Sequence, residues 1–235
     1  GSGTVASANG QSGQSVSNGP LSINDGTGLA SNYNLTTGTF NISQRWVTLS
    51  GTRNYDGTNI AGSSDLTISN LVSGETLGLT GNGTVTSKDV GSNKAITDVS
   101  LTLGDGSGLA ANYTIGTKTL NITQKDVTID GSKVYDGNTS VSSTDISTFN
   151  GLALTETLTI NGTGSVAAPQ VGTNKTLTFG TLTIANGTNG GLASNYTLTS
   201  GTFDVTARPI TLSGSRVYDG STTVSNSNLS TFTNI

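Results

Sequence analysis

The sequence contains no histidine, cysteine or methionine among its 235 residues. It therefore lacks the commonest general base, a catalytic thiol and the soft metal ligands, so no enzyme activity, cofactor or metal is expected. Charge is also sparse, because only 10% of the residues are charged and the formal net charge is -4. Such weak and evenly spread charge argues against nucleic acid or an anionic membrane as a partner. No segment has the pattern of a signal peptide, and no apolar run approaches the ~18 residues of a membrane span.

The six tyrosines that are present reveal the organisation of the chain, because all of them fall into two recurring motifs. The motif Gly-Leu-Ala-Ser/Ala-Asn-Tyr ends at Tyr33, Tyr113 and Tyr196, and the motif Tyr-Asp-Gly begins at Tyr55, Tyr135 and Tyr218. In both motifs the copies are 80 and then 83 residues apart. Self-similarity at a nearly fixed period is the signature of a tandem array.

This period predicts four segments. Residues 1–7 (GSGTVAS) align without a gap on residues 81–87 (GNGTVTS), so the sequence begins within a repeat and is expected to be a window from a longer array. The predicted segments are the C-terminal part of a repeat (residues 1–43), two complete repeats (44–123 and 124–206) and the N-terminal part of a further repeat (207–235).

Apolar and polar residues alternate strictly on both sides of each predicted boundary. In the first copy Phe40, Ile42, Val47 and Leu49 are separated by polar residues or Trp46, and the counterparts in later copies are Leu120, Ile122, Val127, Ile129, Phe203, Val205, Ile210 and Leu212. This period of two is typical of half-buried strands. It predicts an all-β chain of tandem ~80-residue β-sandwich or β-grasp-like repeats. A continuous β-solenoid is the alternative, but the sequence has no sub-period of about 20 to 30 residues.

The linkers between repeats are predicted to be short and rigid. The two tyrosine motifs that flank each boundary are separated by 22 residues in all three copies, from Tyr33 to Tyr55, Tyr113 to Tyr135 and Tyr196 to Tyr218. The intervening stretch contains no flexible Gly/Ser run. We therefore expect the repeats to be joined end to end.

The Tyr-Asp-Gly motif is interpreted as a turn at the end of a strand. The aspartate can accept a hydrogen bond from backbone two residues on, the glycine allows a positive φ, and the tyrosine packs with its hydroxyl on a polar partner. Binding of Ca²⁺ is the alternative, although each repeat supplies only one carboxylate there. The motif residues are Tyr55, Asp56, Gly57, Tyr135, Asp136, Gly137, Tyr218, Asp219 and Gly220.

The Asn-Tyr motif is interpreted as a loop asparagine followed by a buried tyrosine at the start of a strand. Stacking of a sugar on the tyrosine is the alternative. The residues are Asn32, Tyr33, Asn112, Tyr113, Asn195 and Tyr196. Two cations also recur in each copy, Arg45/Lys125/Arg208 and Arg53/Lys133/Arg216; they are either solvated edge charges or partners of a salt bridge to a neighbouring repeat.

Several spaced motifs together resemble the YDG-type repeats, related to those called MBG, of very large bacterial surface and secreted adhesins, including filamentous-haemagglutinin-like exoproteins. They are residues 47–51 (VTLSG), 53–58 (RNYDGT), 90–94 (VGSNK), 108–114 (GLAANYT) and 120–123 (LNIT). The resemblance covers essentially the whole chain. It implies an extracellular stalk or matrix fibre and does not imply catalysis.

The function expected from these features is structural. Tandem all-β repeats are predicted to form an extended extracellular or cell-surface stalk or fibre of a bacterial adhesin, supporting cell attachment or biofilm matrix. The alternative is a binding module that recognises a glycan or self-associates into filaments. The expected partners are neighbouring repeats of the same chain and, in the alternative, surface glycans or other copies of the chain.

Overall fold

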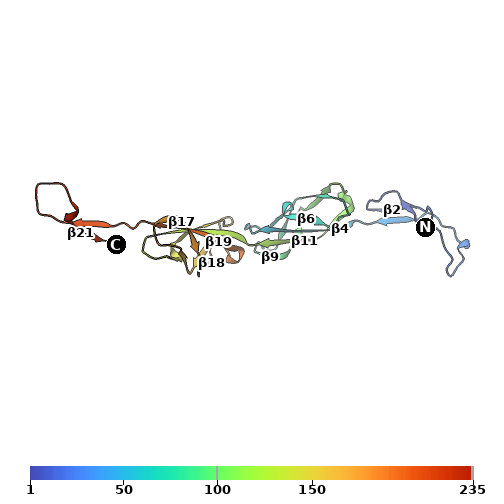
Figure 1. Cartoon of the computed structure of the whole chain (residues 1–235). Helices are drawn as coiled ribbons and strands as arrows, with labels where there is room; N and C mark the ends of the chain where they lie inside the picture. The colour runs from blue at the N-terminus through green and yellow to red at the C-terminus, as the bar shows by residue number, and fades with distance from the viewer. Residues whose placement is uncertain (99, 234–235) are drawn as a thin grey trace. The chain divides into compact units, whose positions relative to one another are not determined.

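The computed structural model describes residues 1–98 and 100–233. In these residues the chain is all-β, as the alternation predicted, and its only helices are single 3-10 turns (Figure 1). The chain divides into two compact units. The first comprises Gly1–Asn54 and Thr58–Thr123, and the second comprises Tyr55–Gly57 and Gln124–Ile235.

The first unit is built on a six-stranded sheet with the order β5-β8-β9-β11-β4-β6. Its strands are β4 (Arg45–Asn54), β5 (Ile60–Gly62), β6 (Leu66–Ser69), β8 (Asn82–Val85), β9 (Gly91–Asp98) and β11 (Tyr113–Thr123). A separate antiparallel pair joins β7 (Leu77–Thr80) to β10 (Thr102–Asp105). Single 3-10 turns, η2 (Ser63–Asp65) and η3 (Ala110–Asn112), precede β6 and β11.

The central pair of this sheet, β4 and β11, is parallel. Arg45 at the start of β4 lies opposite Tyr113 at the start of β11, and Asn54 lies opposite Thr123 at the two ends. The first and last strands of the repeat therefore run in the same direction. As a consequence, the chain enters the repeat at one end of the sheet and leaves it at the other.

The alternating apolar residues of these two strands form the core. Val47 and Leu49 of β4 are fully buried, and so are Leu120 and Ile122 of β11. Successive side chains of a strand point to opposite faces, so the residues between them face outward. The sequence predicted this alternation correctly.

Residues 1–43 form a smaller part of the first unit. Its strands are β1 (Thr4–Val5), β2 (Gln11–Ser17) and β3 (Thr39–Ile42), with a 3-10 turn η1 (Ala30–Asn32). Here the predicted core residue Phe40 is 55% exposed. Its counterpart Leu120 is buried because β11 has a partner on each side, whereas β3 pairs with β2 alone.

The second unit repeats the topology of the first, with the order β13-β16-β17-β19-β12-β14. Its elements are β12 (Lys125–Val134), β13 (Ser140–Ser142), η4 (Ser143–Asp145), β14 (Ile146–Asn150), β15 (Leu158–Asn161), β16 (Thr163–Val166), β17 (Gly172–Thr178), β18 (Thr183–Asn186), η5 (Ala193–Asn195) and β19 (Tyr196–Thr206). The pair β12 and β19 is again parallel, and β15 pairs with β18. Tandem β repeats are thus established.

The core of the second unit surrounds Phe203, which is fully buried. Its buried neighbours in the cluster are Ile129, Val141, Val166, Leu177, Leu182 and Val205. Beyond this core lie a hairpin of β20 (Thr211–Gly214) and β21 (Leu229–Thr233) and the turn η6 (Asn226–Asn228). The predicted core residues Ile210 and Leu212 are exposed there, because this hairpin has only two strands.

Candidate functional site

The Tyr-Asp-Gly motifs form the predicted turns. The glycines adopt positive φ values of 81° at Gly57, 80° at Gly137 and 73° at Gly220. The Oδ1 atom of Asp136 accepts a hydrogen bond of 2.9 Å from the backbone N–H of Asn138, two residues on. Asp219 accepts the equivalent bond from Ser221 N–H, also at 2.9 Å.

The second recurring cation of each repeat holds the loop of its own Tyr-Asp-Gly turn. Lys133 Nζ lies 3.0 Å from Asp136 Oδ1 and donates to the carbonyls of Asn138 and Ser140. Arg53 in the same position donates to the carbonyl of Thr58 at 2.6 Å. Lys133 and Arg53 are therefore not simply solvated edge charges, because each binds the loop of its own repeat.

The aspartate of the second turn is stabilised in its ionised form. The backbone N–H of Asn138 and the ammonium of Lys133 together lower the pKa of Asp136. Both groups bind the carboxylate that the Ca²⁺ alternative would require. Among the described residues, no group of three or more acidic side chains is placed to hold a metal ion.

Tyr55 of the first Tyr-Asp-Gly turn is buried within the second unit. Its side chain is 1% exposed, and its hydroxyl donates a hydrogen bond of 2.6 Å to Oε1 of Glu156. The ring of Tyr55 packs edge-on against the ring of Tyr196, with centroids 5.4 Å apart and an interplanar angle of 80°. The edge-to-face arrangement is a favoured geometry for an aromatic pair.

Tyr196 completes the arrangement around the same carboxylate. Its hydroxyl donates to Oε2 of Glu156 at 2.7 Å and accepts a bond of 3.1 Å from the backbone N–H of Ala153. The 3-10 turn η5 positions this ring, because the backbone N–H of Tyr196 bonds to the carbonyl of Ala193. Glu156 is 5% exposed, so one buried carboxylate accepts hydrogen bonds from two tyrosines.

Gly57 fits against the same residues. A Cβ atom at this position would lie 3.0 Å from Leu154 Cδ1 and 3.3 Å from Ala153 Cβ. This first turn therefore needs glycine both for its positive φ and for this close approach, whereas Gly137 and Gly220 have open space at the same point. We call Tyr55–Gly57 the plug, and Ala153, Leu154, Glu156 and Tyr196 the socket.

The first unit contains the same socket around Glu75 and Tyr113. The Tyr113 hydroxyl donates to Oε2 of Glu75 and accepts a bond of 3.2 Å from the backbone N–H of Val72. This hydrogen bond to Glu75 raises the pKa of Tyr113. Beside the pair lies a hollow of about 340 Å³, whose lining residues are Ala8, Asn9, Gly10, Ile42, Ser43, Arg45, Val72, Glu75, Asn112 and Tyr113. Of the described residues, none from a Tyr-Asp-Gly turn lines it.

The burial of the tyrosines agrees with the predictions at some positions and differs at others. The Asn-Tyr motif places Tyr113 and Tyr196 in buried positions, as expected, but Tyr33 is exposed. Among the Tyr-Asp-Gly turns, Tyr135 is partly exposed and Tyr218 is 92% exposed, so the expected packing of the ring is wrong for Tyr218. The motif forms a turn wherever it occurs, but its ring is buried only where a socket receives it.

The acidic partner of the tyrosines was missed by the sequence interpretation. Glu75 and Glu156 are the two glutamates of the chain, and each begins a Glu-Thr-Leu tripeptide at the same place in its repeat. Recurrence of so rare a residue type was the available signal. This recurrence did not indicate a site, because one carboxylate per repeat is too few for a pair of catalytic carboxylates or for a group of metal ligands.

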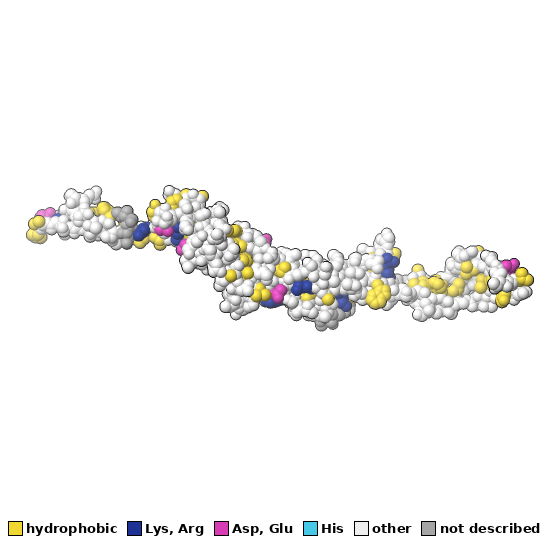
Figure 2. All heavy atoms as spheres, turned by 90° about the horizontal axis from the view of Figure 1, so that it is seen from below, with side chains coloured by type: hydrophobic (Ala, Val, Ile, Leu, Met, Phe, Trp, Pro, Cys, Tyr) yellow, Lys and Arg dark blue, Asp and Glu magenta, His cyan; other side chains and the backbone are white. Residues whose placement is uncertain are grey.

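The surface outside the sockets offers no concentrated charge on the face shown in Figure 2. There, acidic and basic side chains occur in small groups separated by uncharged polar atoms. Within the described residues, no helix is long and apolar enough to cross a membrane.

The second unit is expected to lose stability above about pH 10. Burial is the largest cause that raises the pKa of Tyr196 well above its usual value of 10.0, and the hydrogen bond to Glu156 is the second. The stabilisation that comes from this hydroxyl is fully present at a pH below the pKa that Tyr196 has in the unfolded chain. It is lost as the pH rises further, because the unfolded chain then releases the proton that the folded unit retains. Urea unfolding at a series of alkaline pH values measures this loss, with tyrosinate absorbance as a second readout.

The matched variant for this prediction is Tyr196→Phe, which removes the titrating hydroxyl and keeps the ring. Its stability should be lower at neutral pH but should depend less on pH in the alkaline range. An alkaline pH dependence identical to that of the unaltered chain would contradict the prediction.

The chain is similar to one known family along most of its length. The family described as YDG domain matches residues 43–120 and again residues 116–203. Each match contains one complete socket and one Tyr-Asp-Gly turn. No curated protein and no solved structure matches the chain.

Proposed function

Since the chain belongs to the YDG domain family, we propose that its repeats form an extended extracellular stalk or fibre of a bacterial adhesin. In this proposal the repeats act as spacers that carry an adhesive part away from the cell or build biofilm matrix. The partners of each repeat are its neighbours in the same chain. No catalytic step is assigned to the repeats.

The parallel pairing of the first and last strands of a repeat is the observation that carries this proposal. Because β4 and β11 run in the same direction, and β12 and β19 do as well, each repeat passes the chain from one end of its sheet to the other. An antiparallel pair would instead return the chain to the end at which it entered. An array of such repeats gains length with each copy.

Two further features support a stiff array. Gln124 alone separates β11 from β12, and the 22-residue spacing of the tyrosine motifs is constant. A linker of one residue between two long strands has little conformational freedom. Hydrophilic side chains such as Thr48, Asn121 and Thr128 lie between the buried residues of the strands, which suits a chain in contact with water.

The proposal predicts that length grows in proportion to the number of repeats. A ten-residue strand such as β4 spans roughly 33 Å at about 3.3 Å per residue. The maximum dimension measured by small-angle X-ray scattering should therefore increase by about 30 to 40 Å when residues 124–206 are duplicated within the chain. The unaltered chain is the control. A particle whose maximum dimension does not grow, or whose scattering is that of freely jointed bodies, would contradict the proposal.

A further inference from the structure

The first and last strands of each complete repeat are paired along their whole length. In the first unit β4 and β11 are paired from the first to the last residue of both strands, with one irregularity of register. In the second unit β12 and β19 are paired in the same way, again with one irregularity. Neither pair includes residues 1–43 or 207–235. The long parallel ladder is thus a property of the complete repeat.

The chain enters and leaves the repeat at opposite ends of this ladder. In the second unit it enters through Gln124 at the start of β12 and leaves through Ala207 at the end of β19. Tension along the chain therefore pulls the start of β12 and the end of β19 in opposite directions. Because the two strands are parallel, this pull slides one strand along the other and does not part them at one end. The evenly spaced hydrogen bonds of the ladder then share the force.

Side chains add hydrogen bonds that cross the same ladder. The Oγ1 atom of Thr202 in β19 donates to Oδ1 of Asp130 in β12 at 2.6 Å. At the other end of the pair, Thr197 donates to Oε1 of Gln124 at 2.8 Å. These bonds join the two strands that tension displaces, so they are strained together with the backbone bonds.

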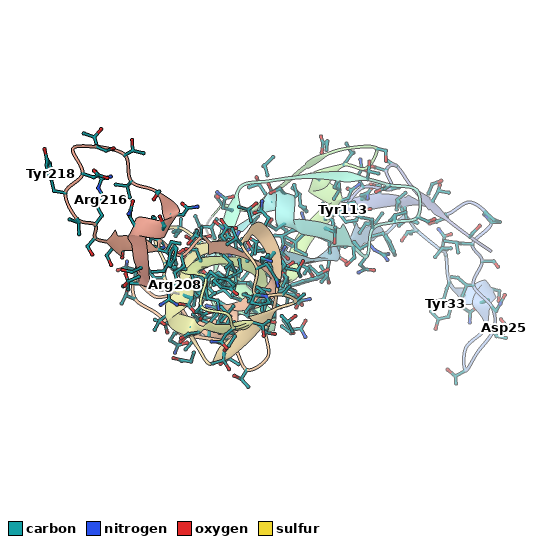
Figure 3. All side chains as sticks on the ribbon, turned by 60° about the vertical axis from the view of Figure 1, so that its left-hand side comes forward. Asp25, Tyr33, Tyr113, Arg208, Arg216 and Tyr218 are labelled. Carbon is teal, nitrogen blue, oxygen red and sulfur yellow. The ribbon has the colours of Figure 1, made fainter. Side chains whose placement is uncertain are left out.

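The core and the neighbouring strands protect the ladder of the second unit. Ile129 of β12 and Phe203 of β19 are fully buried in one cluster. Figure 3 shows side chains filling the interior of this unit around the label of Arg208, which lies two residues after β19. Water competes for backbone hydrogen bonds, so its exclusion slows their rupture. In addition, β12 also pairs with β14, and β19 also pairs with β17, so neither strand slides without breaking a second ladder.

We propose that the pairs β4–β11 and β12–β19 are mechanical clamps, which keep each repeat folded while the chain is under tension. A spacer needs only length, whereas a clamp resists force in one particular direction. The clamp is a property of the single repeat and does not depend on the stalk function. Its strength is set by the direction in which the ladder is pulled, and this direction can be changed experimentally.

Force spectroscopy of the full 235-residue chain tests the clamp with two directions of pull. The chain contains no cysteine, so handles attach only to cysteines that are introduced. Asp126→Cys combined with Thr206→Cys pulls opposite ends of β12 and β19, as tension in the chain does. Asp126→Cys combined with Thr197→Cys pulls the same end of both strands, because Asp126 pairs with Thr197, and opens the ladder bond by bond. The three replaced side chains are exposed.

The unfolding force at one pulling speed should be about twofold or more higher for opposite ends than for the same end. Forced unfolding is governed by the rate of rupture and not by the free energy of unfolding, so the direction of pull decides the result. Both attachments release roughly 240 Å of chain when the unit unfolds, which identifies the event in each record. Urea unfolding without handles should give the same stability for both variants.

Two core substitutions of equal size separate the clamp from overall stability. Ile129 lies in β12, and Leu158 lies in β15 outside the clamp; both are buried. Ile129→Ala and Leu158→Ala each remove the same number of carbon atoms and should both lower the stability measured in urea. When the unit is pulled from opposite ends, Ile129→Ala should lower the unfolding force and Leu158→Ala should leave it nearly unchanged.

Equal unfolding forces in the two directions of pull would overturn the inference. An equal loss of force in Ile129→Ala and Leu158→Ala would do the same, because the force would then follow overall stability. Neither result would alter the growth of the maximum dimension with repeat number. Failure of the clamp and failure of the proposed stalk are therefore distinguished by separate measurements.

Discussion

Glu156→Ala should lower the unfolding free energy of the second unit by about 2 to 4 kcal/mol. The substitution leaves the hydroxyls of Tyr55 and Tyr196 without their common acceptor in a site from which water is excluded. A buried donor without an acceptor costs about 1 to 3 kcal/mol, and two donors are affected. Release of a buried carboxylate offsets part of this loss, which is why the expected total is below the sum of the two terms.

Urea unfolding, combined with hydrogen exchange in β15 and β19, measures the effect in the unit concerned. Glu75→Ala is the matched control within the same chain, because Glu75 holds one tyrosine and is half-buried. We expect a loss of about 1 kcal/mol for this variant, confined to the first unit. Fluorescence of Trp46, the single tryptophan, reports on the first unit and should not change with Glu156→Ala. Equal losses for the two glutamates would show that occupancy of the socket does not matter.

Phe203→Ala should destabilise the second unit by about 3 to 5 kcal/mol. Phe203 is completely buried among aliphatic side chains of several strands, including Ile129 and Leu177. Truncation removes most of its buried apolar area and leaves a cavity that the surrounding sheet cannot close. A small β domain has a total stability of about 5 to 15 kcal/mol, so this unit becomes marginal.

Phe40→Ala is the control for this prediction, because Phe40 occupies the same place in the first copy of the motif but is largely exposed. Its replacement should change stability by about 0.5 kcal/mol or less. Loss of the urea transition of the second unit, with Trp46 fluorescence unchanged, is the expected result for Phe203→Ala. A loss below about 1 kcal/mol would contradict the cavity argument.

The sequence alone determined the all-β class of the fold and its tandem repetition. Alternation such as Val47-Thr48-Leu49 fixes which side chains share a face of a strand, because the backbone of a strand has a period of two whatever it pairs with. The turns were also predictable, because they depend on local features. Asp136 accepts a hydrogen bond from the backbone N–H two residues on, and Gly137 has a positive φ. These properties depend on neighbours in the sequence.

Only the tertiary structure decided which of these local features become buried. Phe40 and Phe203 occupy the same place in their motifs, yet one is exposed and the other is buried, because burial depends on strands that pair from far along the chain. The same reason explains the sockets. Tyr55 meets Glu156 across 101 residues of sequence, and no periodicity links a tyrosine in one repeat to a carboxylate in the next. Hydrophobic patterning specifies which face of a strand a side chain occupies, but the packing of complete strands decides which residues it contacts.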